Sequence, residues 1–271
     1  MSARPIDLVD ARDEANCGGK AVQLGAALRG GLPVPSGFAL DTECVDAIVA
    51  GDAHAITGLR EALARAGGPV AVRSSAVGED SVDASFAGMH RTLLYVRGDD
   101  AVARAIADVH ASAHTDAALA YRTRLGLPST IRIAVVVQRM VAADRAGVLF
   151  TRDPITGRDE RVIESSWGLG EAIVSGMITP DRHRVARDGR IVERVVGDKD
   201  IELLAAPAGG VETRSVDAAR AAAFCLSDDD VRRLHDLADG CERVFGSDPA
   251  DIEWAFAGSD VFLLQRRKMT R

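Results

Sequence analysis

The chain has 271 residues, of which 47% are hydrophobic and 27% are charged, an ordinary composition for a globular protein. Acidic residues outnumber basic ones by 40 to 33, and the resulting net charge of -7 argues against a general nucleic-acid binder. The sequence shows no signal-peptide pattern, and its longest apolar run is far shorter than the roughly 20 residues of a membrane span. The four cysteines form no Cys-x-x-Cys pair. We therefore expect a cytoplasmic protein with free thiols.

Apolar periodicity and breaks at glycine and proline divide the chain into helices and strands. The elements predicted in chain order are a strand over 6–9, a helix between the glycine pairs 18–19 and 30–31, a strand over 37–40, two short helices within 42–66, strands over 70–75 and 92–96, a long amphipathic helix over 99–121, strands over 131–138, 147–150, 162–164, 183–186 and 191–195, a helix over 228–245 capped by Ser227, and a hairpin of 251–256 with 261–267. Strands and helices do not alternate strictly. The pattern therefore predicts an α+β fold with largely antiparallel strands.

Two segments in the first half of the chain suit the binding of an anion. Lys20 stands in the first turn of a glycine-rich helix start, where backbone N–H groups and the positive helix end attract phosphate. The spacing is not that of a Walker A loop, and a lysine at such a position is often simply solvated. Arg73 ends a buried strand beside two serines, which suits either an anion site or a structural ion pair.

Two glycine-rich segments suit a ligand less specifically. The segment 78–88 contains glycine and other small residues, so it is typical of either a lid over a ligand or a plain surface loop. The segment 164–171 joins a strand end to a turn of small residues. It is an incomplete dinucleotide fingerprint, because Ile173 occupies the position of the last glycine.

The C-terminal hairpin is the most informative segment. Asp251 and Glu253 share one face of the first strand, and Gln265 and Arg267 share a face of the second. With a three-residue loop over 258–260, Glu253 lies opposite Gln265 and Asp251 opposite Arg267, whereas a two-residue loop shifts the register. Four converging polar groups on a rigid sheet predict a magnesium site that nucleotide phosphates complete. The alternative interpretation is a salt-bridged face exposed to solvent.

Taken together, these segments resemble the nucleotide-binding domain of phosphoenolpyruvate synthase, pyruvate phosphate dikinase and rifampicin phosphotransferase. The matching stretches are 18–20, 34–38, 72–75, 79–80, 84–88, 138–141, 147–150, 167–171, 179–181, 251–254 and 265–267. They cover nearly the whole chain. The resemblance implies a single ATP-grasp nucleotide-binding domain over 1–271, with two lobes around an ATP cleft. It also implies a kinase-like, ATP-dependent phosphotransferase.

The resemblance also implies roles for individual residues. Lys20, Arg73 and Arg267 would act on the phosphates as catalytic residues, while Glu253 and Gln265 would bind Mg²⁺. The expected ATP-binding set comprises Lys20, Arg73, Ser85, Ala87, Gly88, Gln138, Met140, Val141, Glu171, Asp251, Gln265 and Arg267. The stretch 138–141 would receive adenine through its backbone, and the loop around 85–88 would cover the phosphates.

In this family, transfer runs from ATP to a histidine on a swivelling domain, with release of AMP. None of the six histidines here lies in the Thr-Ser-His setting of that domain. We therefore expect the phosphohistidine and acceptor-substrate domains to be absent from the chain. A separate phosphohistidine protein would then be the partner and a small molecule the final acceptor, with neither nucleic acid nor membrane involved.

Two departures from the family and two other functions stay open. Lys268 stands where the family usually has proline, and residues 89–91 read Met-His-Arg where glutamine often follows the glycine. The first alternative is a kinase or ligase that activates a small acceptor directly. The second is a non-catalytic nucleotide-binding module, against which the joint presence of the lysine, arginine, glutamate and glutamine argues.

Overall fold

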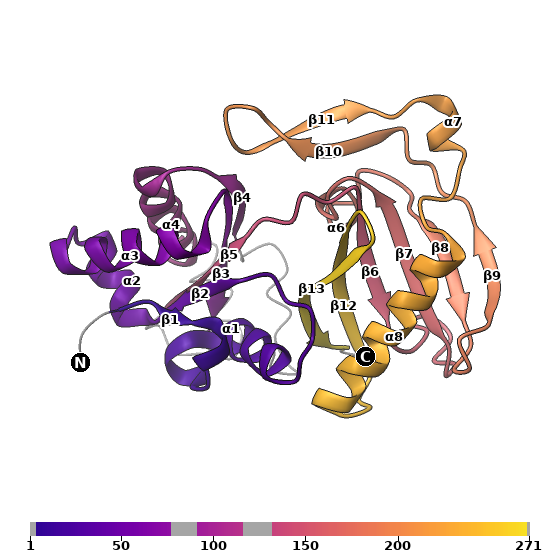
Figure 1. The fold of residues 1–271 in the computed structure, drawn as a ribbon, viewed down its shortest axis with the longest axis horizontal. Coiled ribbons are helices and arrows are strands. Elements are labelled where there is room, and N and C mark those ends of the chain that lie inside the picture. The colour runs from indigo at the N-terminus through magenta and orange to yellow at the C-terminus, as the bar shows by residue number, and fades with distance from the viewer. Residues whose placement is uncertain (1–3, 77–90, 116–131, 270–271) are drawn as a thin grey trace. The chain divides into compact units, whose positions relative to one another are not determined.

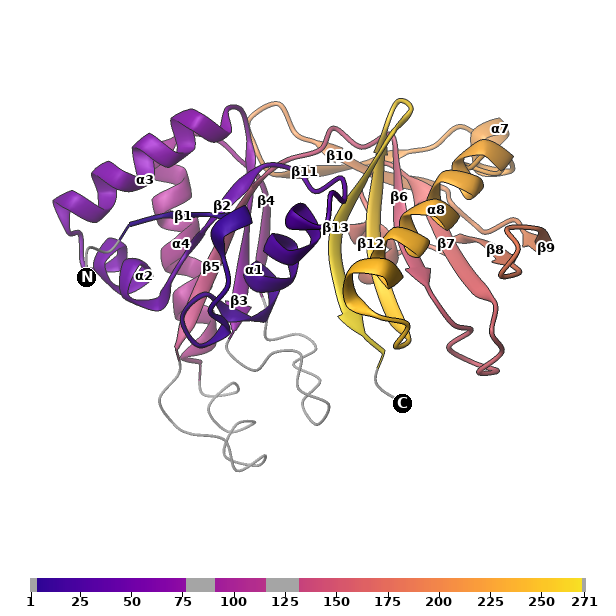
Figure 2. The ribbon, with the colours of Figure 1, turned by 60° about the horizontal axis from the view of Figure 1, so that its bottom comes forward.

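The computed structural model describes residues 4–76, 91–115 and 132–269, which fold into two compact units (Figures 1 and 2). Unit 1 comprises Met1–Arg29, Pro35–Met140 and Ala208–Gly210, and unit 2 comprises Gly30–Val34, Val141–Pro207 and Val211–Arg271. All strand ladders of the described residues are antiparallel, which confirms the predicted α+β class with antiparallel sheets. Within these residues, no helix has both the length and the apolar character of a membrane span.

Unit 1 is built on a five-stranded sheet of order β1-β2-β5-β3-β4. Its strands are β1 (Ile6–Asp7), β2 (Gly37–Leu40), β3 (Val70–Ala76), β4 (Thr92–Val96) and β5 (Ile133–Arg139), and its helices are α1 (Glu14–Arg29), α2 (Thr42–Val49), α3 (Ala53–Ala66) and α4 (Asp99–Ala113). Alternate residues such as Val70 and Val72 bury their side chains in a core with α2, α3 and α4. The other face of β3 carries Arg73 and Ser75, and there α1 packs.

Two predicted elements of unit 1 differ from the structure. The predicted strand over 6–9 ends at Asp7, because Leu8–Asp10 form a 3-10 turn that buries Leu8 and is closed by Ala11 N–H donating to the Leu8 carbonyl at 3.1 Å. The predicted helix over 99–121 ends at Ala113, where the backbone leaves the helical region at His114. Residues 116–131 lie outside the described part of the chain.

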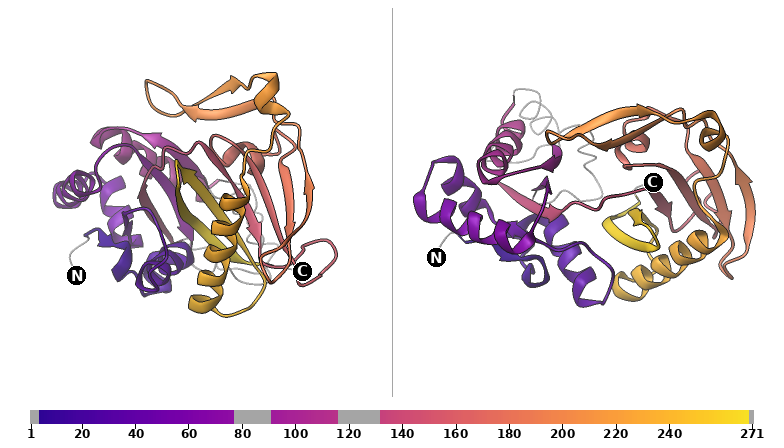
Figure 3. Two further views of the ribbon diagram at one scale, coloured as in Figure 1. Left: turned by 45° about the vertical axis from the view of Figure 1, so that its right-hand side comes forward. Right: turned by 45° about the horizontal axis from the view of Figure 1, so that its top comes forward.

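Unit 2 contains a six-stranded sheet of order β13-β12-β6-β7-β8-β9 and a separate hairpin. The strands are β6 (Arg145–Phe150), β7 (Arg161–Trp167), β8 (Asp181–Val185), β9 (Ile191–Val195), β12 (Ala250–Ala257) and β13 (Asp260–Lys268), the hairpin is β10 (Ile201–Ala205) with β11 (Val211–Ser215), and the helices are α6 (Glu171–Val174), α7 (Ala218–Ala221) and α8 (Asp228–Phe245). Figure 3 shows α8 lying across the sheet. Arg145 and Arg161 fix this helix from one face, as Arg145 donates to Asp230 at 2.8 Å and Arg161 to the His235 carbonyl at 2.6 Å.

The predicted N-cap of α8 is confirmed. The Ser227 hydroxyl oxygen accepts the Asp230 N–H at 3.2 Å, and the Asp230 carboxylate accepts the Ser227 N–H at 3.0 Å. This reciprocal arrangement satisfies two backbone donors that a helix start otherwise leaves without partners.

Replacing Ser227 by alanine should lower the free energy of unfolding by about 1 kcal/mol, because the cap oxygen is lost. Urea denaturation would measure this change, and Ser227→Thr, which keeps the oxygen, should stay close to wild type. A threonine variant as unstable as the alanine variant would contradict the capping explanation.

All four cysteines are free and buried. Burial raises the pKa of Cys17, and it raises the pKa values of Cys44, Cys225 and Cys241 to about 12. These thiols are therefore protonated at neutral pH and shielded from solvent. That they are free agrees with the expectation from the absence of a Cys-x-x-Cys pair.

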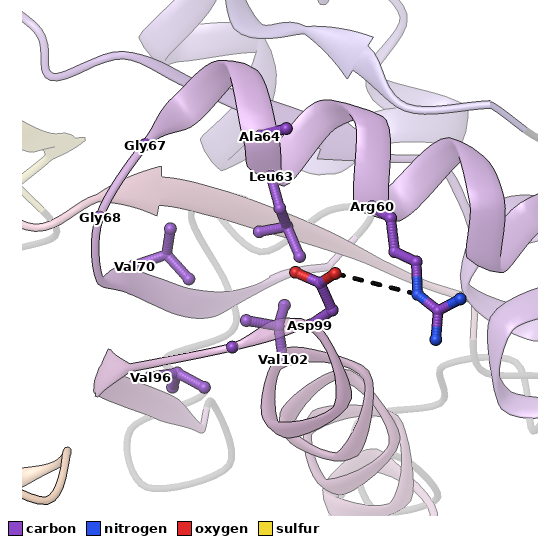
Figure 4. A pocket seen from close by; sticks show the side chains of 10 residues that line it. Arg60, Leu63, Ala64, Gly67, Gly68, Val70, Val96, Asp99 and Val102 are labelled. Atoms are coloured by element: carbon purple, nitrogen blue, oxygen red, sulfur yellow. Dashed lines mark ion pairs between the residues drawn. The ribbon is translucent and has the colours of Figure 1, made fainter.

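Unit 1 also has a shallow hollow between the end of α3 and the start of α4 (Figure 4). Leu63, Val96 and Val102 line it, and Arg60 lies 3.9 Å from the Asp99 carboxylate beside it, in an exposed ion pair. None of the predicted site residues lines this hollow, so it plays no part in the candidate site.

Candidate functional site

Gly18 determines where the lysine-bearing helix begins. Its backbone (φ 74°, ψ 162°) interrupts α1, so the continuous helix starts at Gly19 and Lys20 stands in its first turn. A Cβ atom at Gly18 would lie 2.0 Å from the Ser75 carbonyl oxygen, which excludes any side chain. The Ser75 hydroxyl joins the two elements, because it accepts the Ala21 N–H at 3.1 Å and donates to the Cys17 carbonyl at 2.8 Å.

The two predicted phosphate-binding cations of unit 1 lie at the same junction. Lys20 is 7% exposed and its ammonium group donates to the Ser74 carbonyl at 2.5 Å. Arg73 is the residue that precedes Ser74 in β3 and is 9% exposed. The close approach of α1 to β3 therefore places the Lys20 ammonium group against the β3 residue that follows Arg73.

The predicted adenine-binding stretch continues from β5. Gln138 is 3% exposed, and its side-chain amide donates to the Pro35 carbonyl at 3.2 Å, while the Met140 N–H donates to the Pro69 carbonyl at 3.0 Å. These two donors are used within unit 1, so a base would have to be bound by other backbone atoms of 138–141. The roles of Gln138, Met140 and Val141 stay predictions. Ser85, Ala87 and Gly88 lie outside the described residues.

In unit 2 the terminal hairpin has the residue pairs expected with a three-residue loop, although its turn is one residue shorter. Glu253 lies opposite Gln265 and Asp251 opposite Arg267, which confirms the register. However, the turn holds only Gly258 and Ser259, since Ala257 pairs with Asp260. The three-residue loop on which this register was conditional is therefore absent. A β-bulge at Leu264 adds the missing residue and restores the register, because Trp254 pairs with Leu263 while Glu253 pairs with Gln265.

Three of the four polar side chains of the hairpin interact on one face. The Arg267 guanidinium lies 3.3 Å from the Asp251 carboxylate and 3.6 Å from that of Glu253. Burial raises the pKa of Asp251, Glu253 adds to the rise and Arg267 opposes it. Salt bridges therefore exist here, as the alternative interpretation of the sequence expected.

A magnesium ion would suit the oxygen atoms of Glu253 and Gln265, because hard cations prefer carboxylate and amide oxygens. Among the described residues, no group of three or more histidine, cysteine, aspartate and glutamate side chains could hold a metal ion. The two side chains would therefore need phosphate or water oxygens to complete a magnesium shell. The metal-binding role stays a prediction.

Glu171 lies above the same face of the sheet. Ala255, on the face of β12 that carries Glu253, pairs with Ala146 of β6. A Cβ atom at Gly170 would lie 3.5 Å from that of Ala146, so the turn before α6 covers this part of the face. Because α6 begins at Glu171, the fold brings this predicted ATP-binding residue to the face of the hairpin carboxylates.

Sequence reasoning missed one carboxylate on this face. The predicted strand over 162–164 would end at Glu164, but β7 continues to Trp167 and places Glu164 in mid-strand. Glu164 pairs with Val148, which itself pairs with Glu253. A charged residue within an otherwise buried strand was the signal that could have marked it.

Comparisons with known proteins show the family to which the chain belongs. Residues 52–271 match the family model described as pyruvate phosphate dikinase, AMP/ATP-binding domain. The chain is 36% identical to a rifampicin phosphotransferase of Streptomyces sviceus and 33% identical to a probable phosphoenolpyruvate synthase of Archaeoglobus fulgidus, each over 97% of this chain. The prodigiosin synthesizing transferase PigC of Serratia marcescens is 36% identical over 93% of it.

The chain spans 35%, 41% and 31% of the length of these three relatives. Among solved structures, PH1788 from Pyrococcus horikoshii is similar with a TM-score of 0.48 and 13% identity, covering 93% of this chain and 90% of that one. The family model matches most of the chain, and the relatives exceed 30% identity over nearly all of it. The chain therefore belongs to the family of the pyruvate phosphate dikinase AMP/ATP-binding domain.

Proposed function

We propose that this chain binds Mg-ATP and is the nucleotide-binding part of a phosphotransferase. It passes a pyrophosphoryl group to a histidine outside these 271 residues and releases AMP, or it passes one phosphoryl group to that histidine and the other to water, which also leaves AMP. Family membership carries the proposal. Two groups of side chains support it: the buried cations at the start of α1 and in the middle of β3, and the oxygen-bearing face of the β12–β13 hairpin.

In the proposed reaction the protein contributes positioning and charge. Lys20 and Arg73 would neutralise the phosphates, and Arg267 would steady the terminal phosphates while charge redistributes. Glu253 and Gln265 would hold Mg²⁺, which would supply positive charge to the phosphates. Phosphoryl transfer depends mostly on such electrostatic stabilisation and alignment, so no side-chain nucleophile is needed in this chain.

The first test is calorimetric titration of ATP into the pure protein and its Glu253→Ala variant, with and without magnesium. We expect micromolar-range binding that weakens by about tenfold or more in the variant, because a metal ligand is lost. Without magnesium the two proteins should bind alike. Glu212→Ala, which removes a carboxylate from β11, is the matched control and should bind like wild type.

Two results would contradict parts of the proposal. Equal affinities of wild type and Glu253→Ala in magnesium would remove the metal role, and absence of ATP binding would remove the function proposed for the isolated chain. If ATP binds, addition of a phosphohistidine domain should cause turnover to AMP. Turnover to ADP with a small acceptor alone would instead establish the direct kinase or ligase.

A further inference from the structure

One row of paired residues runs across the sheet of unit 2 on the face opposite α8. Gln265 pairs with Glu253, and Val148 stands between Glu253 and Glu164. The row continues to Arg182, which pairs with Glu164. Residues paired directly across neighbouring strands point to the same side, so Glu164 faces the same space as the proposed magnesium ligands.

The Glu164 side chain is half-buried yet makes no hydrogen bond or ion pair with any residue in the described part of the chain. Burial raises the pKa of its carboxyl group, and the charge of Arg182 opposes the rise. The Arg182 guanidinium itself lies 3.5 Å from Glu193. A desolvated carboxylate with no donor is costly, so donors supplied by a ligand would stabilise it.

The position of Glu164 limits which part of a nucleotide could supply those donors. Glu164 lies two strands away from Glu253, about 10 Å at the usual strand spacing. A magnesium ion at Glu253 would hold the phosphates, so a group at this distance along the nucleotide belongs to its nucleoside half. Ser166, two residues further along β7, pairs with Ala146 beneath the turn that leads to Glu171, so Glu164 lies two residues along its strand from the row that this turn covers.

We propose that Glu164 is a specificity-determining residue of the nucleotide site, whose carboxylate accepts hydrogen bonds from the ribose hydroxyls. This inference rests on the proposed function, because it needs ATP bound over the hairpin face. A carboxylate acceptor fits hydroxyl donors and repels phosphate, which agrees with the separation of β7, which carries Glu164, from β13, which carries Arg267.

The test measures the affinity of the full chain for Mg-ATP, 2′-deoxy-ATP, 3′-deoxy-ATP and the triphosphate of purine riboside, which lacks the amino group. Wild type should bind at least one deoxy analogue about tenfold or more weakly than ATP, since a charge-assisted hydrogen bond is lost. Glu164→Ala should bind ATP as weakly as wild type binds that analogue and should no longer discriminate between the two. Glu193→Ala, on the same face but paired with Arg184 at 2.8 Å, should keep the discrimination.

Each other outcome counts against the inference. If Glu164→Ala still binds ATP more tightly than the deoxy analogues by the same factor as wild type, the inference is overturned. It is also overturned if the variant loses only the discrimination against the purine riboside triphosphate, because Glu164 would then contact the base. If the alanine variant does not fold, the nearly isosteric Glu164→Gln must reduce the discrimination, or the inference fails. Tight ATP binding with no ribose discrimination in wild type removes this inference alone, whereas no ATP binding removes the proposed function with it.

Discussion

Lys199→Met should lower the free energy of unfolding of unit 2 by about 3–5 kcal/mol, because it leaves a carboxylate buried without its counter-charge. The Lys199 ammonium lies 2.5 Å from the Asp181 carboxylate, and both side chains are 0% exposed. Asp181 also accepts the N–H groups of Gly197 and Cys225, at 2.9 and 2.8 Å. The pair therefore ties β8 to the segments that precede β10 and α8.

Urea denaturation followed by tryptophan fluorescence would measure this change, since Trp167 and Trp254 both belong to unit 2. The matched control is Lys268→Met, which removes an exposed lysine 3.0 Å from Asp248 and should leave stability unchanged within error. If Lys199→Met were no more destabilising than this control, the buried ion pair would not stabilise unit 2 as its geometry indicates.

Gly18→Ala should lower the free energy of unfolding of unit 1 by about 2–5 kcal/mol, which combines about 1–2 for a left-handed residue with about 1–3 for steric overlap. The methyl group would overlap the Ser75 carbonyl oxygen at 2.0 Å. Relief of that overlap moves the start of α1 away from β3. Because Lys20 lies on that turn, ATP affinity should fall as well, and both losses can be followed by circular dichroism and calorimetric titration.

Gly51→Ala separates the cost of a positive φ from the cost of steric overlap. Gly51 has a similarly positive φ (79°), but a Cβ atom there would meet nothing within 4 Å. This variant should lose only about 1–2 kcal/mol and should bind ATP like wild type. Equal effects of the two substitutions on stability and binding would contradict the close approach of Gly18 to Ser75 as the reason for a glycine.

Sequence patterns predicted well those helices and strands whose ends are set by neighbouring residues. The helix over 228–245 has the predicted bounds because Ser227 and its acidic first turn define a start, and the strand over 37–40 also matches its prediction. By contrast, the hairpin of β10 and β11 was not predicted, since β11 is mostly exposed and lacks apolar alternation.

The candidate site was only partly predictable, because it depends on pairings between distant strands. The four polar residues of the terminal hairpin could be paired from sequence, although the bulge at Leu264 could not be foreseen from alternation alone. Glu164 joins their row only through β6, which lies between β7 and β12. No local sequence pattern predicts that order of strands, so the position of Glu164 on this face could be found only from the structure.

The burial of every cysteine makes the thiols natural probes of opening. Cys17 and Cys44 belong to unit 1, and Cys225 and Cys241 belong to unit 2. A thiol reagent can modify each of them only when the surrounding structure opens. Pulse labelling followed by mass spectrometry would therefore record the opening rate of each unit separately in the unmodified protein. The same measurement with ATP present would show in which unit the nucleotide slows opening.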